Sequence, residues 1–229
     1  MYLLGIDTSG KSGGVTLAEG DAHTYRALET SAIEGGTFSA QLVPTVASLL
    51  TKRNLSIQDL GGFAVASGPG SFTGLRVGLG AVKGLAEASG KPIATVSMLE
   101  ALAGLSVTEG TVAAAMDAGR NEIYLGLYFT HPGENTSTLI DESLRSQAEL
   151  LEQLAKHPEA TLITSDEAIA NLAAATKTKT ELVKRPDTIL IGSLGLRKLL
   201  AGETVSVEDL DANYIRRSDA EIFHKGARS

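Results

Sequence analysis

The sequence predicts an α/β protein in which two halves repeat one order of elements. First, each half opens with three short apolar or alternating runs separated by turn residues, a pattern typical of meandering strands. These runs span 2–6, 13–18 and 22–29 in the first half, and 112–116, 122–129 and 138–143 in the second. Second, helical and strand periods then alternate in both halves. Three strands, a helix, a strand and a helix make a ribonuclease H-like half. Two such halves in tandem give the actin/Hsp70-like (ASKHA) architecture, with mixed sheets and flanking helices.

The later elements of the first half follow from apolar periodicity and from residues that stop it. They are a helix over 37–52, a strand over 63–66, a helix over 75–90, a strand over 92–96 and a helix over 98–105. Pro44 falls inside the first helix and should kink it. Gly90 ends the second helix. Ser97 and Glu100 have capping-box spacing at the start of the third.

The second half shows the same alternation. Its predicted elements are a helix from Ser146 to His157, a strand over 162–164, helices over 165–175 and 188–200, and an extended piece over 214–217. Ser146 and Glu149 form the capping box of the first helix. We place the boundary between the halves near 106–110, giving a domain 1–107 and a smaller, divergent domain 108–229. The last residues, 223–229, resemble a loose basic tail.

Composition excludes several classes of function. The 229 residues carry a formal net charge of −7, which argues against a free-standing nucleic-acid binder. There is no cysteine, so disulfides and thiolate chemistry are excluded. The first apolar run ends at Asp7 without a basic region before it, unlike a signal peptide. No apolar run approaches the ~20 residues that cross a bilayer. We therefore expect a cytoplasmic protein with no membrane partner.

One glycine-rich stretch, SGPGSFTGLRVGLGAVKG from Ser67, organises the rest of the chain. A glycine loop at a helix N-terminus can bind an anion through free N–H groups, but it can equally serve close packing of strand and helix. The glycines at 68, 70 and 74 are spaced one residue too long for the dinucleotide fingerprint. The weak candidates for phosphate or nucleotide contact are Asp7, Thr8, Ser9, Gly70 and Ser71. For the first three, a local polar turn is an equal alternative.

The other motifs give weaker evidence of a function. Residues 5–12 match the phosphate-loop pattern G-x4-G-K-[ST], but a strand and not a helix follows, so the match is accidental. The four histidines are scattered and predict no metal site. No residue stands in a nucleophile elbow. We expect neither a catalytic residue nor a metal ligand.

The predicted helix over 75–90 is unusual because it is rich in small residues. Glycine costs about 1 kcal/mol relative to alanine inside a helix. Gly74, Gly78, Gly80 and Gly84 nevertheless occur there and lie on more than one face. Packing on the protein's own sheet explains part of this pattern. A second helical partner, within the protein or from another chain, would explain the rest. The helix over 37–52 is its natural companion.

The amino-acid sequence of these segments resembles that of the TsaB family, also called YeaZ. GPGSFTGLRVG and VSMLEALA match its motifs strongly, and IDTS at the start is similar to its opening. MDAGRNEIYLGLY from Met116 and NYIRRSDAE from Asn213 are similar to its hairpin and its ending. Two departures are Phe38, where the family usually has histidine, and Ala212, where it has proline. The resemblance covers most of the chain.

This resemblance implies a non-catalytic subunit in N6-threonylcarbamoylation of adenosine 37 in tRNAs that read ANN codons. The expected partners are the catalytic paralogue TsaD and the ATPase TsaE, and tRNA binds only through the complex. The sequence leaves open whether the chain forms a homodimer when it is alone. TsaD carries an H-x-x-x-H metal motif where this chain has the run Ser97 to Ala101, without either histidine. No cofactor of its own is expected, although ATP or ADP can sit at the interface of the complex.

The resemblance also implies that the apolar helix over 37–52 and the glycine-rich helix over 75–90 form the interface with TsaD. The interface residues expected on their faces are Phe38, Leu42, Val43, Val46, Leu50, Leu75, Gly78, Leu79 and Val82. A Leu79→Arg change is expected to abolish association and leave the fold intact. Two alternatives remain open: an ATP-dependent small-molecule kinase of the actin-like fold, and a peptidase acting on its partner. The first needs further phosphate loops, and the second a nucleophile–base or metal pair.

Overall fold

The structure, a computed structural model, describes residues 1–131, 136–213 and 215. The chain divides into two compact units. Unit 1 contains residues 1–101 and 186–212, and unit 2 contains residues 102–185 and Asn213. No helix in the described ranges is both long and apolar enough to cross a membrane.

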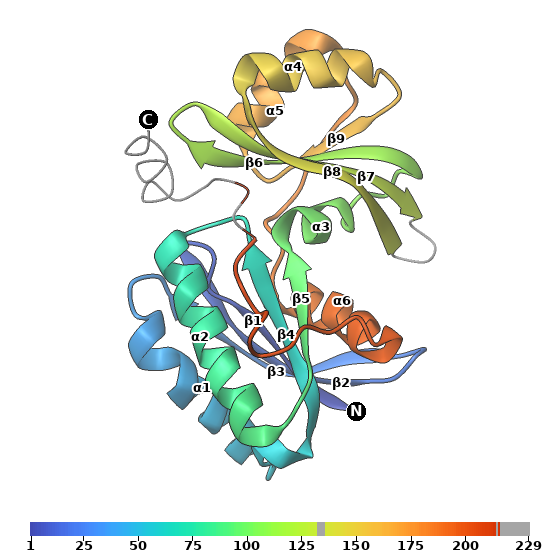
Figure 1. Cartoon of the computed structure of the whole chain (residues 1–229). Helices are drawn as coiled ribbons and strands as arrows, with labels where there is room; N and C mark the ends of the chain where they lie inside the picture. The colour runs from blue at the N-terminus through green and yellow to red at the C-terminus, as the bar shows by residue number, and fades with distance from the viewer. Residues whose placement is uncertain (132–135, 214, 216–229) are drawn as a thin grey trace, which may run out of the picture. The chain divides into compact units, whose positions relative to one another are not determined.

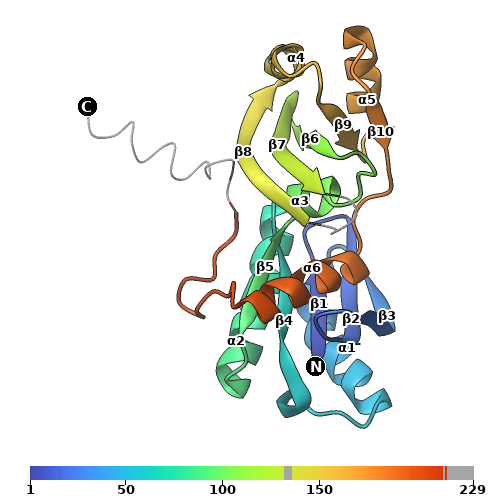
Figure 2. The ribbon, with the colours of Figure 1, turned by 90° about the vertical axis from the view of Figure 1, so that its right-hand side faces the viewer.

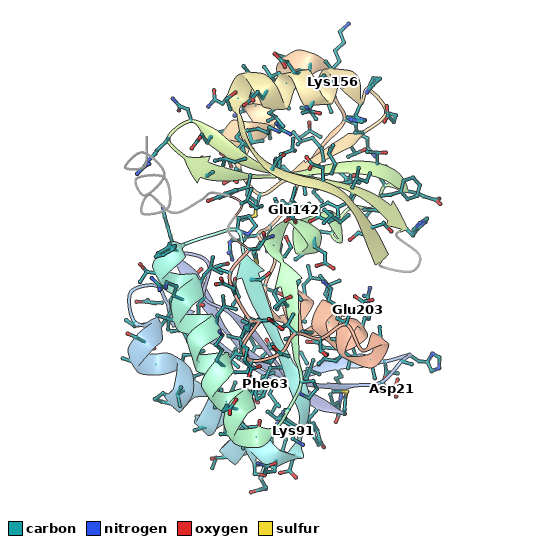
Figure 3. The ribbon with its side chains drawn as sticks, in the orientation of Figure 1. Asp21, Phe63, Lys91, Glu142, Lys156 and Glu203 are labelled. Carbon is teal, nitrogen blue, oxygen red and sulfur yellow. The ribbon has the colours of Figure 1, made fainter. Side chains whose placement is uncertain are left out.

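Unit 1 is built on a mixed five-stranded sheet in the order β3-β2-β1-β4-β5. Its strands are β1 (Tyr2–Asp7), β2 (Ser12–Gly20), β3 (Tyr25–Glu34), β4 (Leu60–Gly68) and β5 (Ile93–Ser97). The first three form the antiparallel meander, and β4 and β5 then run parallel to β1. Phe63 of β4, labelled in Figure 3, is fully buried in this sheet.

Helices cover both faces of the unit 1 sheet. α1 (Phe38–Lys52) and α2 (Phe72–Ser89) lie on one face, and α6 (Thr188–Ala201) lies on the other (Figures 1 and 2). A 3-10 turn (Ile57–Asp59) leads into β4, and the short α3 (Met98–Ala103) follows β5. α6 comes very close to the sheet, because a side chain on Gly5 would overlap the carbonyl of Thr188. The Thr188 hydroxyl also lies 2.6 Å from that of Thr16 in β2.

Unit 2 repeats the architecture with its own five-stranded sheet, ordered β10-β9-β6-β7-β8. Its strands are β6 (Gly110–Gly119), β7 (Glu122–His131), β8 (Thr136–Ser146), β9 (Thr161–Thr164) and β10 (Thr180–Leu182). α4 (Gln147–Lys156), α5 (Glu167–Ala173) and a 3-10 turn (Ala174–Thr176) complete it. Leu125, Leu150 and Ile169 belong to the core between the sheet and its helices.

The repeated order of elements is therefore confirmed, and each sheet places the first strand of its meander beside the next parallel strand. The match of residues 5–12 to the phosphate-loop pattern is confirmed as accidental, because the strand β2 begins at Ser12 where a phosphate loop would lead into a helix. Both capping boxes also form: Ser146 with Glu149, and Ser97 with Glu100.

Several details of the prediction are wrong. The third strand, expected over 22–29, is β3 at Tyr25–Glu34. α2 begins at Phe72, one turn earlier than expected, because the Ser71 hydroxyl accepts the N–H of Gly74 and caps it. The strand β10 was not expected. The domain boundary at 107/108 also differs, since residues 186–212 return to unit 1. The reason is that α6 packs on the unit 1 sheet, where Gly195 lies against Ala64. The extended piece over 214–217, except Ile215, and the tail over 223–229 lie outside the described residues.

Candidate functional site

The end of β1 and the loop before α2 bring together the residues expected to contact phosphate. Asp7, Thr8 and Ser9 leave the sheet at the carboxyl end of β1 and are all buried. One Asp7 carboxylate oxygen accepts the backbone N–H of Ser9 at 2.7 Å and the Ser9 hydroxyl at 2.6 Å. This is the local polar turn that the sequence offered as the alternative to ligand binding.

The glycine-rich loop packs directly on this turn. The Ser71 N–H donates to the Ser9 carbonyl at 2.7 Å, and the Thr8 hydroxyl donates to the Gly74 carbonyl at 2.8 Å. A side chain on Gly70 would overlap Ser9, and one on Gly74 would overlap the Thr8 carbonyl. Close approach of loop and strand therefore accounts for these glycines without a ligand. Phosphate contact at Asp7, Thr8, Ser9, Gly70 and Ser71 stays a prediction.

The paired helices α1 and α2 show a different arrangement from the one expected for an interface. Most of the residues assigned to the interface are buried inside unit 1: Phe38, Leu42, Val46, Leu50, Leu75, Gly78, Leu79 and Val82. Val43, at 50% exposure, is the one of the nine that faces outward. Their burial has a simple cause, since the apolar stripe of an amphipathic helix covers its own core first. Contact of these residues with a partner stays a prediction.

The outward face of the same pair also contains Phe72 and Arg76, which the sequence pattern did not single out. Phe72 is 46% exposed, and the Arg76 guanidinium carbon lies 5.1 Å from the centre of its ring, a cation–π contact. Further along α2, Gly80 and Gly84 are exposed. Apart from the chain neighbours and the backbone of the helix itself, no described atom lies within 4 Å of a side chain placed on either. We call Val43, Phe72, Arg76, Gly80 and Gly84 the α1–α2 outer face. The glycines on more than one face of α2 were its sequence signal.

The run from Ser97 to Ala101, for which the resemblance implies the position of a metal motif, forms a structural cap at the start of α3. The Ser97 hydroxyl accepts the N–H groups of Leu99 and Glu100 at the start of α3. The Glu100 carboxylate binds the Lys198 ammonium of α6 at 2.7 Å. Within the described ranges, no three His, Cys, Asp or Glu side chains come together in a way that could hold a metal ion.

The histidines do not converge. The imidazole of His131 lies 3.9 Å from Glu109, and that of His157 lies 3.4 Å from Glu159, each at a partly exposed position. His23 is in the β2–β3 turn, where its N–H donates to Asp21. His224 lies outside the described residues.

Comparison with known proteins agrees with the geometry. The model of the family TsaD, tRNA N6-adenosine threonylcarbamoyltransferase, matches residues 35–222. The TsaB protein of Bacillus subtilis, described as a tRNA threonylcarbamoyladenosine biosynthesis protein, is 38% identical over 129 residues, 56% of this chain and 55% of that protein. The Escherichia coli TsaB protein is 34% identical over 131 residues, again 56% and 55%. The chain thus spans about half the length of the curated relatives it matches.

Solved structures extend the likeness over nearly the whole chain. The structure of YeaZ from Pseudomonas aeruginosa superposes with a TM-score of 0.74 at 26% sequence identity. This superposition covers 93% of the present chain and 100% of the other. The two-unit architecture with paired mixed sheets is therefore common to both proteins.

Proposed function

Because the chain belongs to the TsaB (YeaZ) family, we propose that it is an accessory subunit in the biosynthesis of threonylcarbamoyladenosine in tRNA. The observation that carries this proposal is the match of a tRNA threonylcarbamoyltransferase family model over residues 35–222. The curated TsaB relatives support it. In this role the chain binds the catalytic paralogue TsaD, and the ATPase TsaE joins the pair. The complex modifies N6 of adenosine 37 in tRNAs that read ANN codons.

The proposed contact with TsaD is the α1–α2 outer face. An exposed aromatic ring beside an arginine is a common anchor of protein interfaces. Gly80 and Gly84 leave the backbone of α2 open, so a helix from the partner can approach closely without a clash. The buried face of the pair, including Leu42 and Leu79, then holds this surface rigid but does not touch the partner.

The accessory role is inferred from the residues that occupy the position of the paralogue's metal motif. The run from Ser97 to Ala101 supplies a hydroxyl cap and a carboxylate that binds Lys198. Neither group has the imidazole chemistry that holds a catalytic metal. The proposal therefore assigns the transfer chemistry to TsaD and assigns this chain the support of the active subunit. A nucleotide, if required, sits at the interface of the complex.

Reconstitution tests the proposal directly. TsaD and TsaE from the same organism are combined with tRNA, ATP and threonylcarbamoyl adenylate, with and without this chain. Modification that appears only when the chain is present, and none from the chain alone, is the expected result. Full modification without the chain overturns the proposal. Tight nucleotide binding or phosphoryl transfer by the lone chain favours the kinase alternative instead.

A further inference from the structure

The strand β8 forms one edge of the unit 2 sheet. The order of the sheet ends at β8, and within the described residues this strand pairs only with β7. Figure 2 shows it at the rim of unit 2. An edge strand of 11 residues is long enough to act as a template, because its outer side offers backbone N–H and C=O groups to a strand of another chain.

The two edges of the unit 1 sheet are protected by other parts of the chain. On β3, the Arg53 guanidinium donates to the carbonyl of Leu28, the extra residue of a bulge, at 2.6 Å. On β5, the N–H of Val205 donates to the Ile93 carbonyl at 2.9 Å and forms an antiparallel bridge. Such covers prevent a sheet edge from pairing with a second molecule. On β8 a bulge leaves Ile140 as the extra residue, but the six residues that follow it pair regularly with β7.

The regular part of β8, residues 141–146, has a charge pattern along one face. Asp141, Ser143 and Arg145 lie opposite alternate residues of β7, so their side chains share a face of the sheet. The side chains of Asp141 and Arg145 remain 52% and 32% exposed. The edge therefore presents a carboxylate, a hydroxyl and a guanidinium in that order.

The Arg145 guanidinium has capacity for a second carboxylate. Its contact with Asp141 of the same strand is long, at 3.7 Å. Its Nε is buried and has no hydrogen-bond acceptor among the described residues. The Asp141 carboxylate also accepts the Ser143 hydroxyl at 3.1 Å. Guanidinium–carboxylate pairs are strongest when two parallel hydrogen bonds form, and the contact within the strand does not reach that geometry.

Symmetry limits the ways in which two copies of β8 can pair. A two-fold axis perpendicular to the sheet makes the strands antiparallel and keeps every side chain on its own face, so one residue must lie opposite its own copy. An axis at Asp141, Glu142 or Arg145 opposes like charges, which is destabilising. An axis at Leu144 sets Arg145 against Ser143. An axis at Ser143 sets each Arg145 against Asp141 of the other copy, with Cβ atoms about 4.5–5.5 Å apart.

We propose that two copies of the chain pair antiparallel through β8, with Ser143 opposite its own copy and each Arg145 opposite Asp141 of the other copy. The side chain of Ile140, 56% exposed in the single chain, is then covered in part by the second copy. The inference is independent of the proposed contact with TsaD, because the β8 edge belongs to unit 2 and the α1–α2 outer face to unit 1. Failure of either proposal leaves the other standing.

A single cysteine tests the register, because the natural chain has none. Ser143→Cys should form disulfide-linked dimers under mild oxidation, since directly opposed strand residues have Cα atoms about 4.5–5.5 Å apart, within the range of a disulfide. Ser137→Cys is the matched control, a half-buried serine of the same strand. Its two copies lie roughly 40 Å apart in this register, so it should cross-link at least about tenfold less. Equal cross-linking of the two variants overturns the proposal.

Charge reversal tests the ion pairs. Asp141→Arg and Arg145→Glu each oppose like charges between identical copies, and each should weaken dimerisation at least about tenfold in sedimentation equilibrium. An equimolar mixture of the two variants should regain dimerisation, because both cross-strand pairs of the mixed dimer again have opposite charges. The pair within each chain stays broken in the mixture, so it cannot cause the rescue. No rescue from two variants that are folded by circular dichroism overturns the proposal; if either variant unfolds, the cysteine pair decides.

Sedimentation of the natural chain completes the test. The expected result is a monomer–dimer equilibrium that shifts toward the dimer as the protein concentration rises. A chain that stays monomeric up to its solubility limit overturns the proposal. Dimerisation that is lost in Gly84→Gln but kept in both charge variants also overturns it, and assigns the contact between copies to the α1–α2 outer face.

Discussion

Lys198 and Glu100 form an ion pair of 2.7 Å that joins α6 to the helix after β5. The Lys198 ammonium also donates to the Thr95 carbonyl at 3.2 Å. Both side chains are largely buried, at 25% and 17% exposure. This contact matters because α6 is separated by most of unit 2 from the rest of unit 1 in the sequence, and it must be held there by tertiary contacts.

The first prediction concerns this pair. Lys198→Met should lower the free energy of unfolding by about 1–3 kcal/mol, since it leaves the Glu100 carboxylate without its cation in a mostly buried position. Urea denaturation measures the change. Lys156→Met, at an exposed position on α4 (Figure 3), is the control and should change stability by no more than about 0.5 kcal/mol. Equal effects of the two changes would contradict the structural role of the pair.

The sequence predicts α6 as a helix but does not predict that it belongs to unit 1. Its helical period and its stop at Gly202 are local signals, and both are visible in the sequence. Its place in unit 1 depends instead on long-range contacts, such as Gly195 against Ala64, which no local pattern contains. The three-residue strand β10 was missed for a related reason: it is too short to show a period, and its pairing with β9 defines it.

The candidate interface is a different case. The sequence correctly indicated two amphipathic helices and an excess of glycine. Its assignment of the apolar stripe to a partner stays a prediction, and the structure buries that stripe inside unit 1. Apolar periodicity reports burial and does not say which molecule buries the residue. Gly80 and Gly84 indicate an exposed helix face more directly. Each costs helix stability, and a side chain placed on either would contact no described atom outside its chain neighbours and the backbone of its own helix.

A second prediction separates the two kinds of glycine in α2. Gly78→Ala should destabilise the protein by about 1–3 kcal/mol, because the new methyl group would overlap the Thr8 hydroxyl. Gly84→Ala should stabilise it by up to about 1 kcal/mol, because the methyl group meets open space and alanine favours the helix. Thermal and urea unfolding of both variants provide the measurement. The same sign for both changes would mean that close packing against Thr8 does not explain Gly78.

The third prediction tests the α1–α2 outer face. Gly84→Gln should weaken association with TsaD at least about tenfold, or ~1.4 kcal/mol, because it fills the space where a partner helix would approach. Calorimetric titration with TsaD measures it. Ala155→Gln, at an exposed position on α4, is the matched control and should bind normally. Undiminished binding of Gly84→Gln would exclude this face.

The structure also changes what Leu79→Arg can test. Leu79 is 5% exposed in the chain alone, so the guanidinium would have to enter the core of unit 1. We now expect this variant to lose stability by several kcal/mol and to fail in binding because it unfolds. Circular dichroism distinguishes the cases. A folded Leu79→Arg protein that does not bind TsaD would restore Leu79 to the interface.

The fourth prediction concerns Glu181 of β10, whose carboxylate holds this edge of unit 2 to the segment before β6. Burial alone would raise its pKa, but hydrogen bonds from the Thr108 and Ser106 hydroxyls, at 2.8 and 2.9 Å, and the nearby Lys179 ammonium lower the pKa below its ordinary value of 4.5. A carboxyl group with a lowered folded-state pKa stabilises the protein above its unfolded pKa. That contribution is lost as the pH falls through the folded-state value.

Glu181→Gln should therefore be less stable than the natural chain near neutral pH, and the difference should shrink as the pH falls below about 4.5. Urea denaturation of both proteins from about pH 6 to about pH 3 measures it. Comparing the two proteins cancels the titration of groups common to both, such as Glu149, whose pKa is lowered by its capping-box hydrogen bonds to Ser146. A stability difference that stays constant over this range would show that the Glu181 charge does not hold the edge strand in place.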